Sequence, residues 1–151
     1  GELYLALLGY RDAQCIQLAN ATCTALQLVN FWQDISRDAA KNRIYIPLEE
    51  LHNAGISEDD VLNGRNSAAS ARLIITLCDK TAPLFRTGLK LLQLLSRREA
   101  YNVSLFSLGG MAMLDTVRIN RDRILTYRPT LSKGRLLRLG IQALFGFGRK
   151  Q

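Results

Sequence analysis

Residues 23–47 (CTALQLVNFWQDISRDAAKNRIYIP) constrain the fold most, because their apolar residues recur at helical spacing opposite an unusual polar face. Asp34 and Asp38 are four residues apart, so in a helix their side chains share one face, one turn apart. At the helical rotation per residue, the polar face covers an arc of about 80°. It comprises Gln27, Asn30, Asp34, Asp38 and Lys41. The opposite, apolar face comprises Leu28, Val29, Trp32, Ile35 and Ala39.

The polar face carries residue types that a purely solvent-facing helix avoids. Asn and Asp in a helix interior are each about 0.5 kcal/mol or more less favourable than Ala, whereas Lys, Glu, Gln and Arg are good helix formers. Asn30, Asp34 and Asp38 supply oxygen atoms instead. Two carboxylates beside a carboxamide suit Mg²⁺, which takes oxygen ligands and leaves positions open for water and phosphate. On spacing alone, a solvated face that is merely acidic remains the alternative.

The longer string QLVNFWQDISRDAAKNRIYIP resembles the second aspartate-rich motif of the squalene/phytoene synthase family, the head-to-head prenyl transferases. The family pattern runs Gln-Leu-x-Asn, then Asp-x-x-x-Asp, then Arg-Ile-Tyr-x-Pro. The matching residues here are Gln27, Asn30, Asp34, Asp38, Arg43, Tyr45 and Pro47. The Phe-Trp-Gln-Asp run at 31–34 is most similar to the hydroxysqualene synthases of the hopanoid branch. Phytoene synthases usually have Leu-Arg-Asp there, so Gln33 argues against that branch.

Helical spacing of leucines dominates the rest of the chain and no strand-like alternation persists, so we expect an all-α fold. The Arg-Pro-x-Leu-Ser-Lys string at 128–133 resembles the family's C-terminal signature, which extends the resemblance over nearly the whole chain. The resemblance implies the C-terminal part of an isoprenoid-synthase-type helical bundle. With 48% hydrophobic residues and no linker, residues 1–151 are expected to form a single partial domain with a basic amphipathic tail at 134–151.

Local signals place the individual helices. Asp12 is a capping residue, Gly55 and Gly64 are helix exits, and Ser57 begins a capping-box-like sequence. Pro83 is expected to kink or split its helix, and Arg97–Glu99 to form a solvated turn. The expected helices span residues 2–8, 12–40, 48–54, 57–64, 66–98 and 101–118, with a last helix after Ser132.

Charge and composition exclude several function classes. The net charge of +7 suits a diphosphate substrate or an anionic membrane. Nucleic acid is not the expected partner, because no stacking aromatics interleave with the basic residues. His52 is the single histidine, which leaves no material for His-based metal sites or Ser-His-Asp triads. Three cysteines without metal-ligand spacing indicate reduced, mostly buried residues of a cytoplasmic protein. The basic tail either lies on a membrane surface or packs its apolar face on the core.

The resemblance implies Mg²⁺-assisted ionisation of a prenyl diphosphate, either farnesyl or presqualene diphosphate. By this resemblance, Asp34 and Asp38 bind Mg²⁺ and act in catalysis, with Asn30 as a further metal ligand. Gln27 and Asn30 support the diphosphate–metal cluster. For the hopanoid branch, presqualene diphosphate is ionised and quenched by water to give hydroxysqualene, without a reducing nicotinamide cofactor.

Three further residues are implied in the same site by the resemblance. Arg43 and Arg128 are candidates for diphosphate contact, and Tyr45 for catalysis or for shaping the pocket. For the two arginines, an ordinary surface ion pair is the alternative.

The family's first aspartate-rich motif has no match in this sequence. We therefore expect roughly the C-terminal half of a longer enzyme domain, a missing N-terminal half as its partner, and no catalysis by these 151 residues alone. Three alternatives remain: a phytoene or dehydrosqualene synthase-like condensing enzyme, a non-catalytic helical binding protein, and a basic membrane-surface protein.

Overall fold

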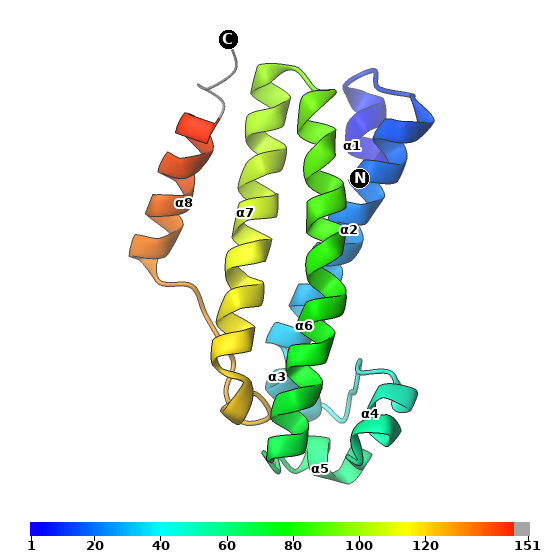
Figure 1. Ribbon diagram of the computed structural model, residues 1–151, viewed down its shortest axis with the longest axis vertical. Helices are drawn as coiled ribbons and strands as arrows, with labels where there is room; N and C mark the ends of the chain where they lie inside the picture. Colours follow the sequence, from blue (N-terminus) through cyan, green and yellow to red (C-terminus); the bar gives the residue numbers. More distant parts are fainter. Residues whose placement is uncertain (147–151) are drawn as a thin grey trace. The chain divides into compact units, whose positions relative to one another are not determined.

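The computed structural model describes residues 1–146 of the 151-residue chain, with side chains described for residues 1–143. Every regular element within this range is helical, which confirms the predicted all-α class (Figure 1). The elements are α1 (Glu2–Leu7), α2 (Ala13–Gln33), α3 (Ile35–Ala39), α4 (Leu48–Ala54), α5 (Glu58–Leu62), α6 (Ala68–Leu89), η1 (Lys90–Gln93), α7 (Arg97–Ile119), η2 (Arg121–Arg123) and α8 (Lys133–Gly146). The end of the predicted basic tail, residues 147–151, lies outside the described residues.

Local capping signals set several helix boundaries where the sequence predicts them. The Asp12 carboxylate accepts hydrogen bonds from the backbone N–H groups two and three residues later (2.9 and 3.2 Å) and so caps α2. Helix α4 ends at Gly55, whose φ of +68° is the left-handed conformation that glycine adopts without strain. Helix α5 begins with a reciprocal capping box between Ser57 and Asp60.

Two predictions about α6 and α7 are wrong. Helix α6 continues through Pro83 without a split, but it ends at Leu89 rather than near residue 98. Arg97 begins α7 instead of lying in a solvated turn. The reason is a cap: the Ser96 N–H donates to the Glu99 carboxylate (3.1 Å), and the Glu99 N–H donates to the Ser96 hydroxyl (3.5 Å).

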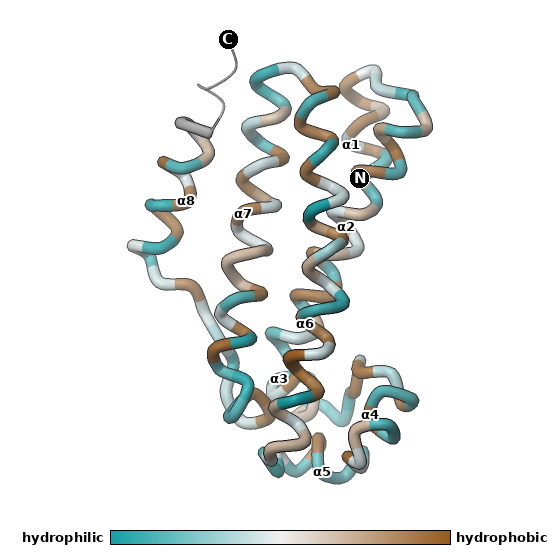
Figure 2. The backbone as a smooth tube through the Cα atoms, viewed as in Figure 1, coloured by the Kyte–Doolittle hydropathy of each residue, from teal (hydrophilic) through white to brown (hydrophobic). Residues whose placement is uncertain are grey.

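The chain divides into two compact units, and each is described by itself. The first unit comprises residues 1–27, 82–112 and the chain from 131, and the second comprises residues 28–81 and 113–130. Figure 2 shows hydrophobic and hydrophilic segments alternating along the helices, as expected for helices that bury one face.

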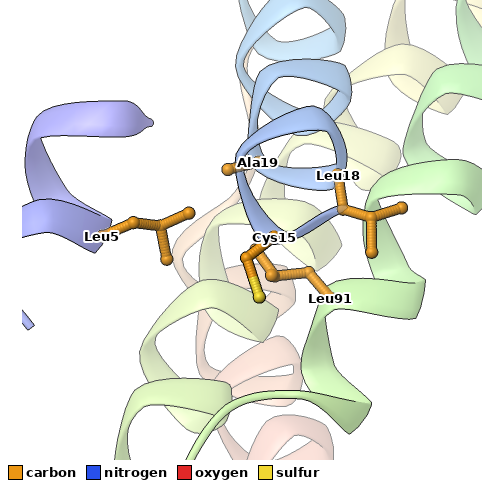
Figure 3. Close-up of a cluster of buried hydrophobic side chains, with 5 residues drawn as sticks. All are labelled: Leu5, Cys15, Leu18, Ala19 and Leu91. Carbon is orange, nitrogen blue, oxygen red and sulfur yellow. The ribbon is translucent and has the colours of Figure 1, made fainter. Parts of the chain in front are cut away.

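In the first unit, α1 folds back on the beginning of α2. Leu5 extends from α1 towards the α2 side chains, and a leucine of η1 completes the buried cluster (Figure 3). The cluster comprises Leu5, Cys15, Leu18, Ala19 and Leu91. It buries the apolar side of the short helix α1, which would be marginal by itself in water.

In the second unit, the loop after η2 is fixed by one asparagine. The Asn66 side chain accepts from the Leu125 N–H (3.1 Å) and donates to the Thr126 hydroxyl (3.1 Å). Ile124 and Leu125 are buried. These contacts fix the course of the chain just before Arg128.

Candidate functional site

Helix α2 ends at Gln33, so the helix predicted to continue to about residue 40 is interrupted at Asp34. Asp34 is the N-cap residue of α3, with φ −97° and ψ 9°. Backbone hydrogen bonds with the helical i to i−4 pattern are nevertheless present on both sides of Asp34. The Asp34 N–H donates to the Asn30 carbonyl (3.0 Å), and the Asp38 N–H donates to the Asp34 carbonyl (2.8 Å). The predicted one-turn spacing of the two aspartates is therefore retained across the interruption.

The apolar face opposite the aspartates is buried, as the sequence predicts. Val29, Trp32 and Ile35 are 2%, 3% and 6% exposed. The Trp32 indole N–H donates to the Thr81 hydroxyl on α6 (3.0 Å), which satisfies its one polar atom. This packing fixes the rotation of the segment within the second unit, and leaves Asp34 and Asp38 half-buried.

Arg128 is paired with Asp34: its Nε donates to Oδ1 of the carboxylate. The two side chains are 39% and 27% exposed, so the ion pair lies at the edge of the protein rather than in the core. The structure thus places Arg128, a predicted diphosphate ligand, next to Asp34, a predicted metal ligand. The contact between them is an ion pair, which is the alternative that the sequence leaves open for Arg128.

Gln33 is the supporting residue that sequence reasoning missed. Its amide Nε2 donates to the Pro129 carbonyl (2.9 Å), and both residues are buried. The bond holds the chain next to Arg128 against the end of α2. The sequence does contain a signal for this role. Gln33 is polar and lies between Trp32, which is buried, and Asp34, which is half-buried, so its amide needs a hydrogen-bond partner.

Asp38 has a different set of neighbours. It lines a small hollow together with Phe31, Arg43 and Tyr45. The Tyr45 ring stacks on Phe31, with ring centroids 4.5 Å apart and an angle of 8° between the planes. The turn that returns Tyr45 to α2 passes through Asn42, whose φ of +54° is a left-handed conformation that asparagine tolerates. The structure thus brings three predicted site residues, Asp38, Arg43 and Tyr45, to one hollow.

The two predicted carboxamides are less closely tied to the carboxylates. Asn30 lies one turn before Asp34 and is exposed. Gln27 is also exposed on α2, on the part of that helix that belongs to the first unit. Their roles as metal and diphosphate ligands stay predictions.

The donor chemistry of the second unit fits Mg²⁺. Two half-buried carboxylates, Asp34 and Asp38, supply hard oxygen ligands at one-turn spacing. Across the described residues, no group of three or more His, Cys, Asp or Glu side chains is arranged to hold a metal ion. A site of this kind suits an ion that keeps water or phosphate oxygens in its coordination shell, as Mg²⁺ does, and not a structural zinc ion with four protein ligands.

The first unit contains an apolar cavity of about 300 Å³. Its lining residues are Gly1, Tyr4, Leu5, Ala19, Thr22, Cys23, Leu26, Leu91, Val103 and Phe106. The wall is nearly all hydrocarbon, so it is suited to an apolar ligand.

Comparison with known proteins finds relatives that belong to one type of enzyme, the squalene and phytoene synthases. The family model for squalene/phytoene synthase matches residues 1–135. The chain is 30% identical over 118 residues to a 15-cis-phytoene synthase of Synechocystis, covering 76% of this chain and 35% of that protein. It is 40% identical over 60 residues to a presqualene diphosphate synthase of Rhodopseudomonas palustris, covering 40% of this chain and 22% of that protein.

Among solved structures, the chain is similar to squalene synthase HpnC from Alicyclobacillus acidocaldarius. The TM-score is 0.76 at 38% sequence identity, and the match covers 79% of this chain and 45% of that one. The all-α fold is therefore shared with that enzyme, while this chain spans less than half the length of the relatives it matches. Because the family model matches most of the chain, this protein belongs to the squalene/phytoene synthase family.

Proposed function

We propose that this chain contributes a Mg²⁺- and diphosphate-binding site to a hydroxysqualene synthase-like reaction, in which presqualene diphosphate is converted to hydroxysqualene in hopanoid biosynthesis. The observation that carries the proposal is the contact of Arg128 with Asp34, one helical turn from Asp38. It joins carboxylates that suit a divalent cation to a guanidinium that suits phosphate oxygens.

Each residue has a distinct task in this proposal. Asp34 and Asp38, with Asn30, hold Mg²⁺, which when bound neutralises the charge that develops on the leaving diphosphate. Arg128 donates to the diphosphate oxygens, for which the planar guanidinium is suited. Arg43 stands beside Asp38 at the hollow and is a second donor. Tyr45 shapes the wall of the same hollow through its stack on Phe31.

Further features bear on the prenyl chain and on the diphosphate of the substrate. The cavity of about 300 Å³ in the first unit suits a prenyl hydrocarbon chain, because apolar walls exclude water from a reactive carbocation. Gln27 is proposed to support the diphosphate from α2. The relatives named squalene synthase and presqualene diphosphate synthase support a substrate of this chemical class.

A condensing enzyme of the phytoene or dehydrosqualene synthase type is the second candidate. The specific observation in its favour is that several relatives are phytoene synthases, including one of Pseudescherichia vulneris at 34% identity over 85 residues. Mass spectrometry of the products separates the two candidates, when it is applied to a protein that also carries the second acidic group that turnover is proposed to need. An alcohol supports hydroxysqualene formation, and a hydrocarbon supports the condensing enzyme.

Binding of a substrate analogue tests the proposal against a non-catalytic helical scaffold. We expect calorimetric titration with farnesyl thiodiphosphate and Mg²⁺ to show binding that Asp34→Asn abolishes. Asp59→Asn is the matched control, because Asp59 is an exposed carboxylate on α5 paired with Arg65. Equal binding by the wild type and Asp34→Asn would support the scaffold instead.

We further propose that the enzyme is cytoplasmic and touches an anionic membrane surface through α8. Leu137 and Ile141 are 68% and 47% exposed, and basic residues Lys133 and Arg138 are on the same helix. In the described part of the chain, no helix has the length and apolar character needed to cross a bilayer. We expect Leu137→Asp to weaken flotation with anionic vesicles more than Gln142→Asp, which adds the same charge at another position of α8. Equal flotation of both variants would count against α8.

Turnover is proposed to need a second group of acidic residues, supplied from outside residues 1–151. Asp34 and Asp38 are two carboxylates, and the proposed site lacks a third in the described residues. A further protein segment, in the same polypeptide or in a partner chain, would complete the site.

A further inference from the structure

The Arg128–Asp34 ion pair uses the same carboxylate that the proposed function assigns to Mg²⁺. Arg128 Nε donates to Oδ1 of Asp34, and the pair is partly shielded, with 39% and 27% of the side chains exposed. A guanidinium and a metal ion bound to the same carboxylate repel each other, because both are cationic. Metal binding to Asp34 therefore competes with Arg128.

Hydrogen bonds hold the backbone on both sides of Arg128, so only the Arg128 side chain has to move for Asp34 to be released. Gln33 holds the Pro129 carbonyl at 2.9 Å, and Pro129 is fully buried. On the other side, Asn66 holds the Leu125 N–H at 3.1 Å. Arg128 can leave Asp34 by rotating about its own side-chain bonds, without movement of the loop.

We propose that Arg128 couples the binding of metal to the binding of diphosphate. In the absence of an anion, the guanidinium holds Asp34 and opposes the metal. When a diphosphate arrives, the guanidinium exchanges its carboxylate partner for phosphate oxygens, which are the stronger acceptor array, and frees Asp34. Metal and diphosphate then bind cooperatively, and linkage requires that each raises the affinity of the other by the same factor. This inference rests on the proposed role of Asp34 as a metal ligand.

The test measures Mn²⁺ binding to the 151-residue chain by electron paramagnetic resonance, with and without inorganic pyrophosphate. For the wild type we expect weak binding of Mn²⁺ alone and a marked increase in affinity with pyrophosphate. Arg128→Gln should bind Mn²⁺ alone about fivefold more tightly, because a partly exposed competing ion pair is worth about that factor. The same variant should lose most of the enhancement by pyrophosphate.

Arg37→Gln is the matched control, because Arg37 is an exposed arginine on α3 within one turn of Asp34 and Asp38. It removes the same charge nearby, so it reports the effect of net charge alone and should keep the enhancement. Arg128→Lys keeps the charge but lacks the planar fork, and should restore only part of the coupling. Circular dichroism checks that each variant is folded.

The outcomes separate the two proposals. If Arg128→Gln and Arg37→Gln have the same Mn²⁺ affinity and the same enhancement, while Asp34→Asn still abolishes Mn²⁺ binding, the coupling is wrong and the metal site stands. If Asp34→Asn leaves Mn²⁺ binding unchanged, with and without pyrophosphate, the metal site itself is wrong and the coupling falls with it.

Discussion

At the scale of single residues, Gln33 shows how a neutral side chain organises charged ones. Its amide joins the end of α2 to the Pro129 carbonyl at 2.9 Å, one position from Arg128. Its neighbour in sequence is Asp34, which Arg128 contacts. Two adjacent residues at the end of α2, Gln33 and Asp34, thus contact two adjacent residues of the distant loop, Pro129 and Arg128. A hydrogen bond between uncharged groups therefore lies directly beside the ion pair.

We predict that Gln33→Leu destabilises the protein by about 1–3 kcal/mol, because it leaves the buried Pro129 carbonyl without its donor. Urea unfolding measures the difference. Gln14→Leu makes the same change at an exposed position of α2 and should alter stability by about 0.5 kcal/mol or less. Equal effects of the two substitutions would show that the Gln33 bond contributes nothing.

At the scale of helices, glycines set how closely the helices of the first unit approach. A Cβ added at Gly88 of α6 would lie 2.0 Å from Thr22 Oγ1 and 3.0 Å from the Thr22 backbone nitrogen. At Gly110 of α7, a Cβ would lie 2.5 Å from the Phe85 ring. Gly109, its neighbour, has nothing within 4 Å. Only one of the paired glycines is therefore required by packing.

We predict opposite effects for the same substitution at two of these positions. Gly88→Ala should destabilise by about 1–3 kcal/mol, because Thr22 and its backbone must shift to accommodate the methyl group. Gly109→Ala should stabilise by about 1 kcal/mol, the helix propensity gained at an open position. Thermal and urea unfolding measure both. A destabilised Gly109→Ala protein would contradict the open surroundings of that position.

A second helix-level prediction concerns pH. The Glu99 carboxylate accepts from the Ser96 N–H at the start of α7 and from the Tyr10 hydroxyl (2.6 Å). Hydrogen bonding by the Ser96 side chain, followed by that of Tyr10, lowers the pKa of Glu99 from its ordinary value of 4.5, and the Ser96 N–H adds to the effect. The stability from this cap is therefore complete above pH 4.5 and is lost as the pH falls through the lowered pKa.

Tyr10 sets the alkaline end of the pH range over which this contact stabilises the protein. Its hydrogen bond to Glu99 raises the pKa of Tyr10 above 10.0, so its contribution is complete below pH 10.0 and is lost as the pH rises through the raised pKa. Urea unfolding across the pH range should show Glu99→Gln to be less stable than the wild type between these limits, with the difference shrinking in acid. Tyr10→Phe should remove the alkaline loss. If Glu99→Gln remained less stable than the wild type by the same amount in acid, the lowered pKa of Glu99 would not be the source of the pH dependence.

At the scale of the whole molecule, the chain belongs to the squalene/phytoene synthase family and covers 22% to 45% of the relatives compared above. Its net charge of +7 suits a diphosphate substrate. Under the proposed function, binding and turnover are separate expectations: the Asp34 site should suffice for binding of the diphosphate, whereas turnover should require a second acidic group.

We predict that the 151-residue chain does not convert presqualene diphosphate in the presence of Mg²⁺, because two carboxylates hold too little Mg²⁺ to neutralise the charge on the leaving diphosphate. Mass spectrometry of extracted products measures conversion, with the squalene synthase of Alicyclobacillus acidocaldarius as a parallel reaction. Formation of hydroxysqualene by the chain alone would show that the second acidic group is unnecessary.

The sequence alone determined the features that depend on neighbours within a few residues. The family motif is identified from a short stretch of sequence by resemblance, and the one-turn spacing of Asp34 and Asp38, the Asp12 cap and the Ser57–Asp60 box follow from short-range geometry. It missed the interruption at Asp34, because the backbone hydrogen bonds there still follow the helical step and no local breaker marks the position.

Only the tertiary structure decided which distant groups meet the aspartates. Arg128 and Asp34 are separated by 94 positions, and Gln33 and Pro129 by 96. No local periodicity links such positions, since their approach depends on packing that fixes the loop through Asn66 and buries Pro129. The sequence could therefore propose Arg128 as a phosphate ligand, whereas its contact with Asp34 follows from the fold.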